Sequence, residues 1–203
     1  RTLALTLLVL LLAPPVLAEE SSKEIARRRY RSGMAAFTLE RYEDAIKEFE
    51  AGFLAEPDAV FLYNIGQAYR LWKRPEQALN YYKKLIEKYP ASSLISEAKY
   101  KIGLCYFELK EYDLAIDNLE DRSRISDPAK LRRIAEILSS AYLVKKNYPA
   151  ATREFAFLAD NAPEKQRAGY RDRVRELVEK NLTESELSTI ATGTTYPSDI
   201  ALL

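Results

Sequence analysis

The chain repeats a small set of residue types at an interval of about 34 residues, and no other feature limits its possible folds as strongly. Small residues follow one another after 33, 37 and 36 positions, at Gly33, Gly66, Gly103 and Ser139. An alanine stands 12 positions after each of them, at Ala45, Ala78, Ala115 and Ala151. Such a period is typical of stacked units, each a pair of helices that cannot bury its apolar face alone.

The small residues predict where the two helices of a unit approach each other closely. A side chain at Gly33, Gly66 or Gly103 would hold the helices apart, and overpacking of this kind costs about 1–3 kcal/mol. The alanines are expected to play the matching role on the second helix. Tyrosines are expected as wedges between helices, and prolines as the ends of second helices, at Tyr69, Tyr106, Tyr142, Pro57, Pro90 and Pro163.

The landmarks divide the chain into four units, 26–58, 59–94, 95–129 and 130–163. First helices are expected near 26–39, 59–72, 95–109 and 130–145, and second helices near 42–55, 75–88, 112–123 and 148–161. A charged helix over 164–182 then covers the end of the array. Over 183–203, Thr183 and Glu186 predict a capping box that opens a short helix. A loop and the possible start of a truncated further repeat follow.

Several stretches of the chain resemble the tetratricopeptide repeat (TPR). Tyr42-Glu43-Asp44-Ala45 and Tyr112-Asp113-Leu114-Ala115 resemble the opening of its second helix, and Asn64-Ile65-Gly66-Gln67-Ala68-Tyr69 resembles its first helix. The resemblance covers 26–163. It implies an all-α fold, an α-solenoid of TPR helix–turn–helix hairpins with a C-terminal capping helix. The third unit departs from the pattern, because Pro128 stands one position late, and the fourth departs with Ser139 in place of the glycine.

The resemblance also implies that the first helices line a concave groove for a protein or peptide partner. The projected groove positions are Arg27, Tyr30, Met34, Phe37, Tyr63, Asn64, Gln67, Arg70, Tyr100, Leu104 and Phe107. Aromatic side chains and arginines are frequent anchors of protein interfaces. The amides of Asn64 and Gln67 suit a peptide backbone. For each of these residues, packing between hairpins is the alternative interpretation.

Residues 1–18 have the pattern of an export signal. An apolar run from Leu3 to Leu12 is followed by two prolines and by the small residue Ala18 ahead of Glu19. This order predicts a signal peptide cleaved after Ala18 and a periplasmic protein. A stable membrane anchor is disfavoured because a spanning helix needs about 20 apolar residues. The linker 19–25 would then lead into the array.

Composition excludes several classes of function. The chain has no histidine and one cysteine, Cys105, so neither a Ser-His-Asp triad nor a structural zinc site is expected. No cofactor is expected either. Cys105 is predicted to be a buried thiol. The 31 basic and 30 acidic residues are interspersed, unlike the clustered basic face of nucleic-acid-binding proteins. The one dense basic run, Arg27-Arg28-Arg29 with Arg31, is interpreted as a solvated helix start.

These patterns predict an exported TPR scaffold that binds a segment of another envelope protein. Its order of parts resembles periplasmic TPR proteins of outer-membrane assembly and cell-division coordination. One alternative is the N-terminal helical module of a larger envelope protein, such as a penicillin-binding-protein activator, because residues 182–203 resemble the linker of that class. An enzyme is the other alternative, disfavoured because acid pairs such as Glu120-Asp121 have no convergent partner. The oligomeric state is left open.

Overall fold

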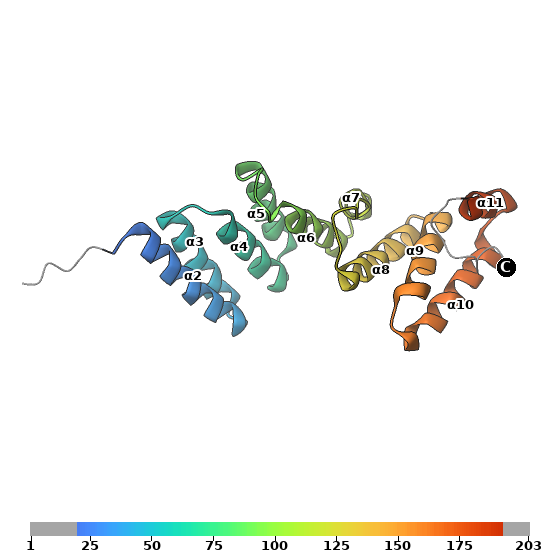
Figure 1. The fold of residues 1–203 in the computed structure, drawn as a ribbon, viewed down its shortest axis with the longest axis horizontal. Helices are drawn as coiled ribbons and strands as arrows, with labels where there is room; N and C mark the ends of the chain where they lie inside the picture. Colours follow the sequence, from blue (N-terminus) through green and yellow to red (C-terminus); the bar gives the residue numbers. More distant parts are fainter. Residues whose placement is uncertain (1–19, 193–203) are drawn as a thin grey trace, which may run out of the picture.

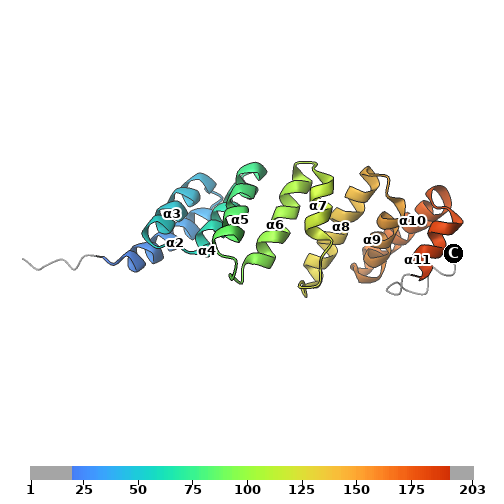
Figure 2. The same ribbon diagram turned by 90° about the horizontal axis from the view of Figure 1, so that it is seen from above.

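A computed structural model describes residues 20–192, and in that range the chain forms ten α-helices and no strand. Eight helices pair into four hairpins that follow one another in a single row, with α2 at one end and α11 at the other (Figures 1 and 2). The first helices are α2 (Ser22–Thr38), α4 (Ala59–Leu71), α6 (Ile95–Glu108) and α8 (Pro128–Val144). The second helices are α3 (Tyr42–Ala55), α5 (Pro75–Lys88), α7 (Tyr112–Leu119) and α9 (Tyr148–Asn161).

The row ends in two further helices, α10 (Glu164–Asn181) and α11 (Glu184–Thr192), which both contact α9. Thr183 and Glu186 form the predicted capping box of α11, in which the Glu186 N–H donates to Thr183 Oγ1 and the Thr183 N–H donates to Glu186 Oε2. The predicted α-solenoid with a C-terminal capping helix is therefore confirmed. The proposed signal peptide over 1–18 and the loop and repeat start near the C-terminus lie outside the described residues.

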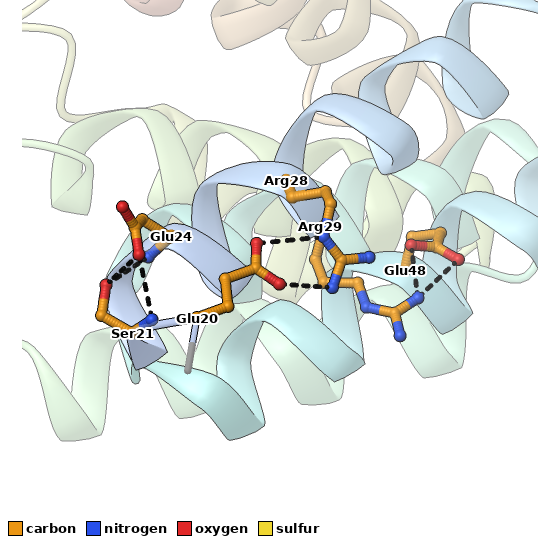
Figure 3. Close-up of polar contacts among 6 residues, drawn as sticks. All are labelled: Glu20, Ser21, Glu24, Arg28, Arg29 and Glu48. Atoms are coloured by element: carbon orange, nitrogen blue, oxygen red, sulfur yellow. Dashed lines mark hydrogen bonds and ion pairs between the residues drawn. The ribbon is translucent and has the colours of Figure 1, made fainter. Parts of the chain in front are cut away.

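The bounds of α3, α5 and α9 are those that the sequence predicts, but α2 begins earlier than expected. It begins at Ser22 instead of residue 26 because Ser21 and Glu24 form a capping box (Figure 3). The Glu24 N–H donates to Ser21 Oγ at 3.3 Å, and the Ser21 N–H donates to Glu24 Oε2 at 3.0 Å. Both donors would otherwise be unsatisfied at the helix end. Most of the linker expected over 19–25 is therefore helical.

The junction between α7 and α8 also differs from the prediction. α7 ends at Leu119 instead of residue 123, because Ser123 donates to Asp121 from both its N–H and its hydroxyl, and such local bonds compete with a helix. α8 begins at Pro128 instead of residue 130. Asp127 caps it by accepting from the Ala129 N–H at 2.8 Å, and proline is favourable at a first helical position because no N–H is needed there.

The three repeat glycines do lie where helices approach closely. A Cβ at Gly33 would lie 2.5 Å from the ring of Phe49, and one at Gly66 would lie 2.7 Å from the ring of Tyr82. At Gly103 it would lie 2.5 Å from Leu119. Each glycine thus makes room for a large side chain on the second helix of its own hairpin. The matching alanines, Ala45, Ala78, Ala115 and Ala151, are fully buried beside them.

The apolar core runs along the whole row as three neighbouring clusters between the stacked hairpins. Cys105 is fully buried in the middle cluster, as predicted. Burial raises the pKa of its thiol to about 12, so the nucleophilic thiolate is not formed at neutral pH. Within residues 20–192, no helix has the length and apolar character that crossing a membrane requires.

Candidate protein-binding face

Side chains of the four first helices, α2, α4, α6 and α8, contact side chains of the next first helix. We call the surface that these helices form the first-helix face. The rings of Tyr30 on α2 and Phe61 on α4 meet edge to face, with centroids 6.1 Å apart. Tyr63 on α4 donates from its hydroxyl to Glu97 on α6 at 3.4 Å. Glu97 in turn accepts from Lys130 on α8. Consecutive units are thus joined across this face.

A row of charged side chains crosses the middle of the first-helix face. Arg70 on α4 pairs with Glu108 on α6 at 3.1 Å, and Lys101 lies 3.5 Å from Glu97. The side chains of Arg70 and Lys101 are only 17% and 14% exposed. Their charged ends are therefore held in a partly dry surface, where electrostatic interactions are stronger than in bulk water.

The surroundings of these charges shift their protonation equilibria. Burial lowers the pKa of Lys101, and the nearby Arg70 guanidinium lowers it further. Burial alone would raise the pKa of Glu97, but the hydrogen bond from Lys130 and the charge of Lys101 outweigh it, so the pKa lies below its ordinary value. Glu97 is consequently an anion at neutral pH. The face presents fixed charges of both signs side by side.

Comparison with known proteins agrees with this architecture. The profile of the tetratricopeptide repeat family matches residues 30–93 and 73–130, which contain most of the first three hairpins. This chain is a tetratricopeptide repeat protein. The fourth hairpin, α8–α9, lies beyond the matched residues but repeats the same pairing, with Ala151 fully buried at the equivalent position. None of the curated protein sequences compared with the chain matches it significantly.

Solved TPR structures share the fold at low sequence identity. MamA from Desulfovibrio magneticus RS-1 superposes with a TM-score of 0.64 at 18% identity, over 83% of this chain and 90% of that one. YrrB superposes with a TM-score of 0.59 at 19% identity, over 73% and 74%. PilF from Pseudomonas aeruginosa gives 0.58 at 16% identity, over 89% and 82%. At these identities the likeness concerns the fold alone.

The predicted groove residues of this TPR protein differ widely in exposure. Arg27 is exposed, and most of the others are partly buried in the first-helix face. Tyr100 and Leu104 are only 7% and 9% exposed, because they pack in the apolar cluster that contains Ile134 and Leu138. The three equivalent tyrosines therefore do not form an evenly exposed ladder. Tyr30 and Tyr63 offer surface to a partner, whereas Tyr100 offers little.

Several predicted side chains also contact residues of their own unit. The side-chain amide of Asn64 donates to the Val60 carbonyl at 2.9 Å, and Gln67 Oε1 accepts from the Tyr82 hydroxyl at 3.2 Å. The Phe37 and Phe107 rings each meet a tyrosine of the next helix edge to face, with centroids 5.8 Å apart. Met34 packs against the N-terminal cluster. The groove role of these residues stays a prediction.

Lys101 and Lys130 belong to the charged row, but the sequence prediction did not include them. Lys101 follows Glu97 by four positions, which places both on one helix face. Lys130 follows Glu97 by 33 positions, a separation close to the repeat period. The same spacing joins other units, because Asp113 pairs with Lys145 across 32 positions. Opposite charges about one repeat apart are the signal that could have identified this row.

The first-helix face is hollowed at its N-terminal end, between α2 and α4. An open pocket of about 430 Å³ lies there, with Ala26, Tyr30, Val60 and Phe61 among its lining residues. Within the described part of the chain, no group of three acidic or cysteine side chains is arranged to hold a metal ion.

Proposed function

We propose that this TPR protein is an exported scaffold that binds a segment of another envelope protein along its first-helix face. The row of partly buried charges across α4, α6 and α8 carries the proposal. Among the described carboxylates, Arg70 contacts only Glu108, through Nη1, and a guanidinium has five N–H donors. The Nε–H of Arg70 is buried, and Gln67 Oε1 already accepts from the Tyr82 hydroxyl. The remaining Nη donors of Arg70 and the side-chain NH₂ group of Gln67 are therefore the groups that we propose for contact with a peptide backbone.

The fold supports a binding role without naming the partner. Stacked hairpins create a long surface whose side chains are fixed by packing between units, and fixed side chains lose little entropy on binding. YrrB, which shares the fold, is described as a TPR protein with an unusual peptide-binding site. We propose that this chain likewise binds a peptide segment on its stacked helical surface.

Export is the second part of the proposal and rests on the leader-like residues 1–18. We expect a bacterial host to deliver the protein to the periplasm and to cleave it after Ala18. Cell fractionation followed by N-terminal sequencing tests this expectation. A chain that begins at Glu19 in the periplasmic fraction supports it, and an uncleaved chain confined to the cytoplasm would refute it.

Partner capture tests the binding role. The full chain is used as bait in envelope extract beside two charge-reversed variants. The first carries Lys130→Glu and Arg133→Glu on the first-helix face, and the control carries Lys47→Glu and Lys88→Glu on the second helices α3 and α5. We expect a specific partner to be lost with the first variant and kept with the control. If both variants keep every partner while circular dichroism shows unchanged helicity, the interface is elsewhere.

A further inference from the structure

The basic side chains of α2 divide into those that form an ion pair and those that do not. Arg28 donates to Glu20 through Nε and Nη2, and Arg29 donates to both carboxylate oxygens of Glu48 on α3 (Figure 3). None of the ion pairs among residues 20–192 includes Lys23, Arg27 or Arg31. Glu24, the carboxylate nearest to Arg27 in sequence, forms the hydrogen bonds of the capping box, and it interacts with Arg27 through its charge without forming an ion pair.

The three cations that form no ion pair make up one ridge. Lys23, Arg27 and Arg31 follow one another at intervals of four residues and are all exposed. Side chains at that interval lie on the same face of a helix, about 6 Å apart along its axis. The ridge borders the pocket between α2 and α4, because all three side chains line it together with Tyr30 and Val60.

The requirements of the fold do not account for this ridge. Like charges four residues apart destabilise a helix, and a cation in the first turn, such as Lys23, opposes the positive end of the helix dipole. The adjoining pocket is mainly apolar, and its floor includes Tyr30, whose hydroxyl forms no hydrogen bond with residues 20–192. A free ridge of cations beside an open apolar pocket is the arrangement that suits a charged amphipathic ligand.

We propose that this pocket, lined by Ala26, Tyr30, Val60 and Phe61 and bordered by the cation ridge, docks an acidic amphipathic helix of the partner protein. The inference rests on the proposed function and assigns one subsite of the first-helix face. Carboxylates four residues apart on the partner helix would face Lys23, Arg27 and Arg31 at the same spacing. The apolar residues beside those carboxylates would enter the pocket, in the manner of a helix in a groove.

The opposite rim of the pocket adds a condition on the partner. It carries two acids, Glu56 and Asp58, and Asp58 already caps α4 by accepting from the Val60 N–H. A helix that is acidic along both sides would meet repulsion there. The docked helix therefore carries its carboxylates on the α2 side and neutral or basic groups on the other, which fixes its rotation in the pocket.

A designed peptide tests the proposal directly on the full chain. The probe is a fluorescein-labelled helical peptide of about 15 residues, long enough to form a helix on binding, with a leucine ridge flanked on one side by glutamates four residues apart. The control peptide has lysines in place of the glutamates. Binding is measured by fluorescence anisotropy. We expect the acidic peptide to bind, to weaken between about 50 and about 300 mM NaCl, and to outcompete the basic control.

Variants of one helix separate the ridge from the general charge of α2. Arg27→Glu with Arg31→Glu is expected to weaken acidic-peptide binding at least about tenfold. Arg28→Gln with Arg29→Gln alters the two cations that already have partners, and is expected to change binding less than about twofold. Equal weakening by both pairs, or equal binding of the two peptides, would overturn the proposal. Peptide-independent dimerisation that Arg27→Glu abolishes would also overturn it, by assigning the pocket to a second copy.

The two proposals fail in different ways. If the acidic peptide does not bind while the envelope partner is still lost with Lys130→Glu and Arg133→Glu, the pocket assignment alone is wrong. If the peptide binds through the ridge while every envelope partner survives both charge-reversed baits, the pocket stands and the central row is not the partner's main site.

Discussion

The hairpins α4–α5 and α8–α9 share the same outline but are packed by different means. In α4–α5 the ring of Tyr82 lies directly over Gly66 and is fully buried. In α8–α9 a serine, Ser139, replaces the glycine, and the equivalent ring, Phe155, is only partly buried. Phe155 instead faces Tyr170 of the capping helix, with ring centroids 6.3 Å apart. The interior hairpin is closed by its own side chains, whereas the last hairpin depends on its cap.

The two hairpins also differ in how many polar side chains they bury. Apart from tyrosines, the buried polar side chains among residues 20–190 all belong to α8–α9, namely Ser139, Thr152 and Glu154. Ser139 and Thr152 donate to carbonyls of their own helices, at 3.0 and 2.8 Å. Glu154 accepts two hydrogen bonds from Arg122 of the α7–α8 loop, at 3.0 and 2.8 Å. Satisfied polar groups add little net stability but specify one arrangement, so α8–α9 adds specific polar contacts to its buried apolar residues.

Removal of the aromatic ring is expected to reveal the largest difference in stability between α4–α5 and α8–α9. Tyr82→Ala deletes a fully buried ring and is expected to lower the free energy of unfolding by about 3–5 kcal/mol. Phe155→Ala should cost about half as much, because its ring is already partly exposed. Urea unfolding followed by circular dichroism measures both. Equal losses would show that the cap buries Phe155 as completely as the hairpin buries Tyr82.

The ion pair of Arg122 and Glu154 tests the polar side of the comparison. Arg122→Met leaves a carboxylate that is 7% exposed without its partner, and is expected to cost about 2–4 kcal/mol near neutral pH. Burial already raises the pKa of Glu154 above its ordinary value, against the opposing effect of Arg122. Loss of Arg122 raises this pKa further.

The sign of the pH dependence follows from that shift. A folded state with the higher pKa holds the proton more tightly than the unfolded state, so the variant regains stability as the pH falls from about 7 towards about 5. Urea titrations of parent and variant at both values measure the difference between them. A difference that does not shrink at the lower pH would mean that Glu154 stays hydrated in the variant.

The next largest difference in stability is expected from changes at the small residue of the first helix, which is Gly66 in α4 and Ser139 in α8. Gly66→Ala places a Cβ 2.7 Å from the ring of Tyr82 and is expected to destabilise the protein by about 1–3 kcal/mol. The matched control, Ser139→Ala, removes only a hydroxyl that bonds within its own helix, and should change stability by less than about 0.5 kcal/mol. Thermal unfolding of the two variants reports both values, and a neutral Gly66→Ala would contradict the close packing.

The smallest expected effect has the opposite sign and lies in the cap. Gly169 sits inside α10, and a Cβ there would meet nothing within 4 Å. Gly169→Ala should therefore stabilise the protein by about 0.5–1 kcal/mol, because alanine restricts the unfolded chain and favours the helix. An increase in the thermal midpoint checks this. A decrease would contradict the open surroundings of Gly169.

The sequence by itself determined the number of hairpins and the bounds of α3, α5 and α9, and it placed the bounds of the other hairpin helices within four residues. Short-range spacing carries this information, since Gly66 and Ala78 stand within one hairpin and their small volumes are required whatever the neighbouring units do. Capping residues act just as locally, and Thr183 with Glu186 therefore predicted the start of α11 correctly. The Ser21–Glu24 pair carried the same signal for α2, although the sequence prediction placed that helix start later.

The exposure of individual groove positions was decided only by the tertiary structure. Tyr63 and Tyr100 occupy equivalent places in the repeat, yet Tyr100 is buried because the hairpin α8–α9 stacks against it. The pairs Arg70–Glu108 and Lys130–Glu97 likewise join residues 38 and 33 positions apart. Their formation depends on how each hairpin rotates against the next. That rotation is set by the packing of whole side chains between units, which no short-range spacing records.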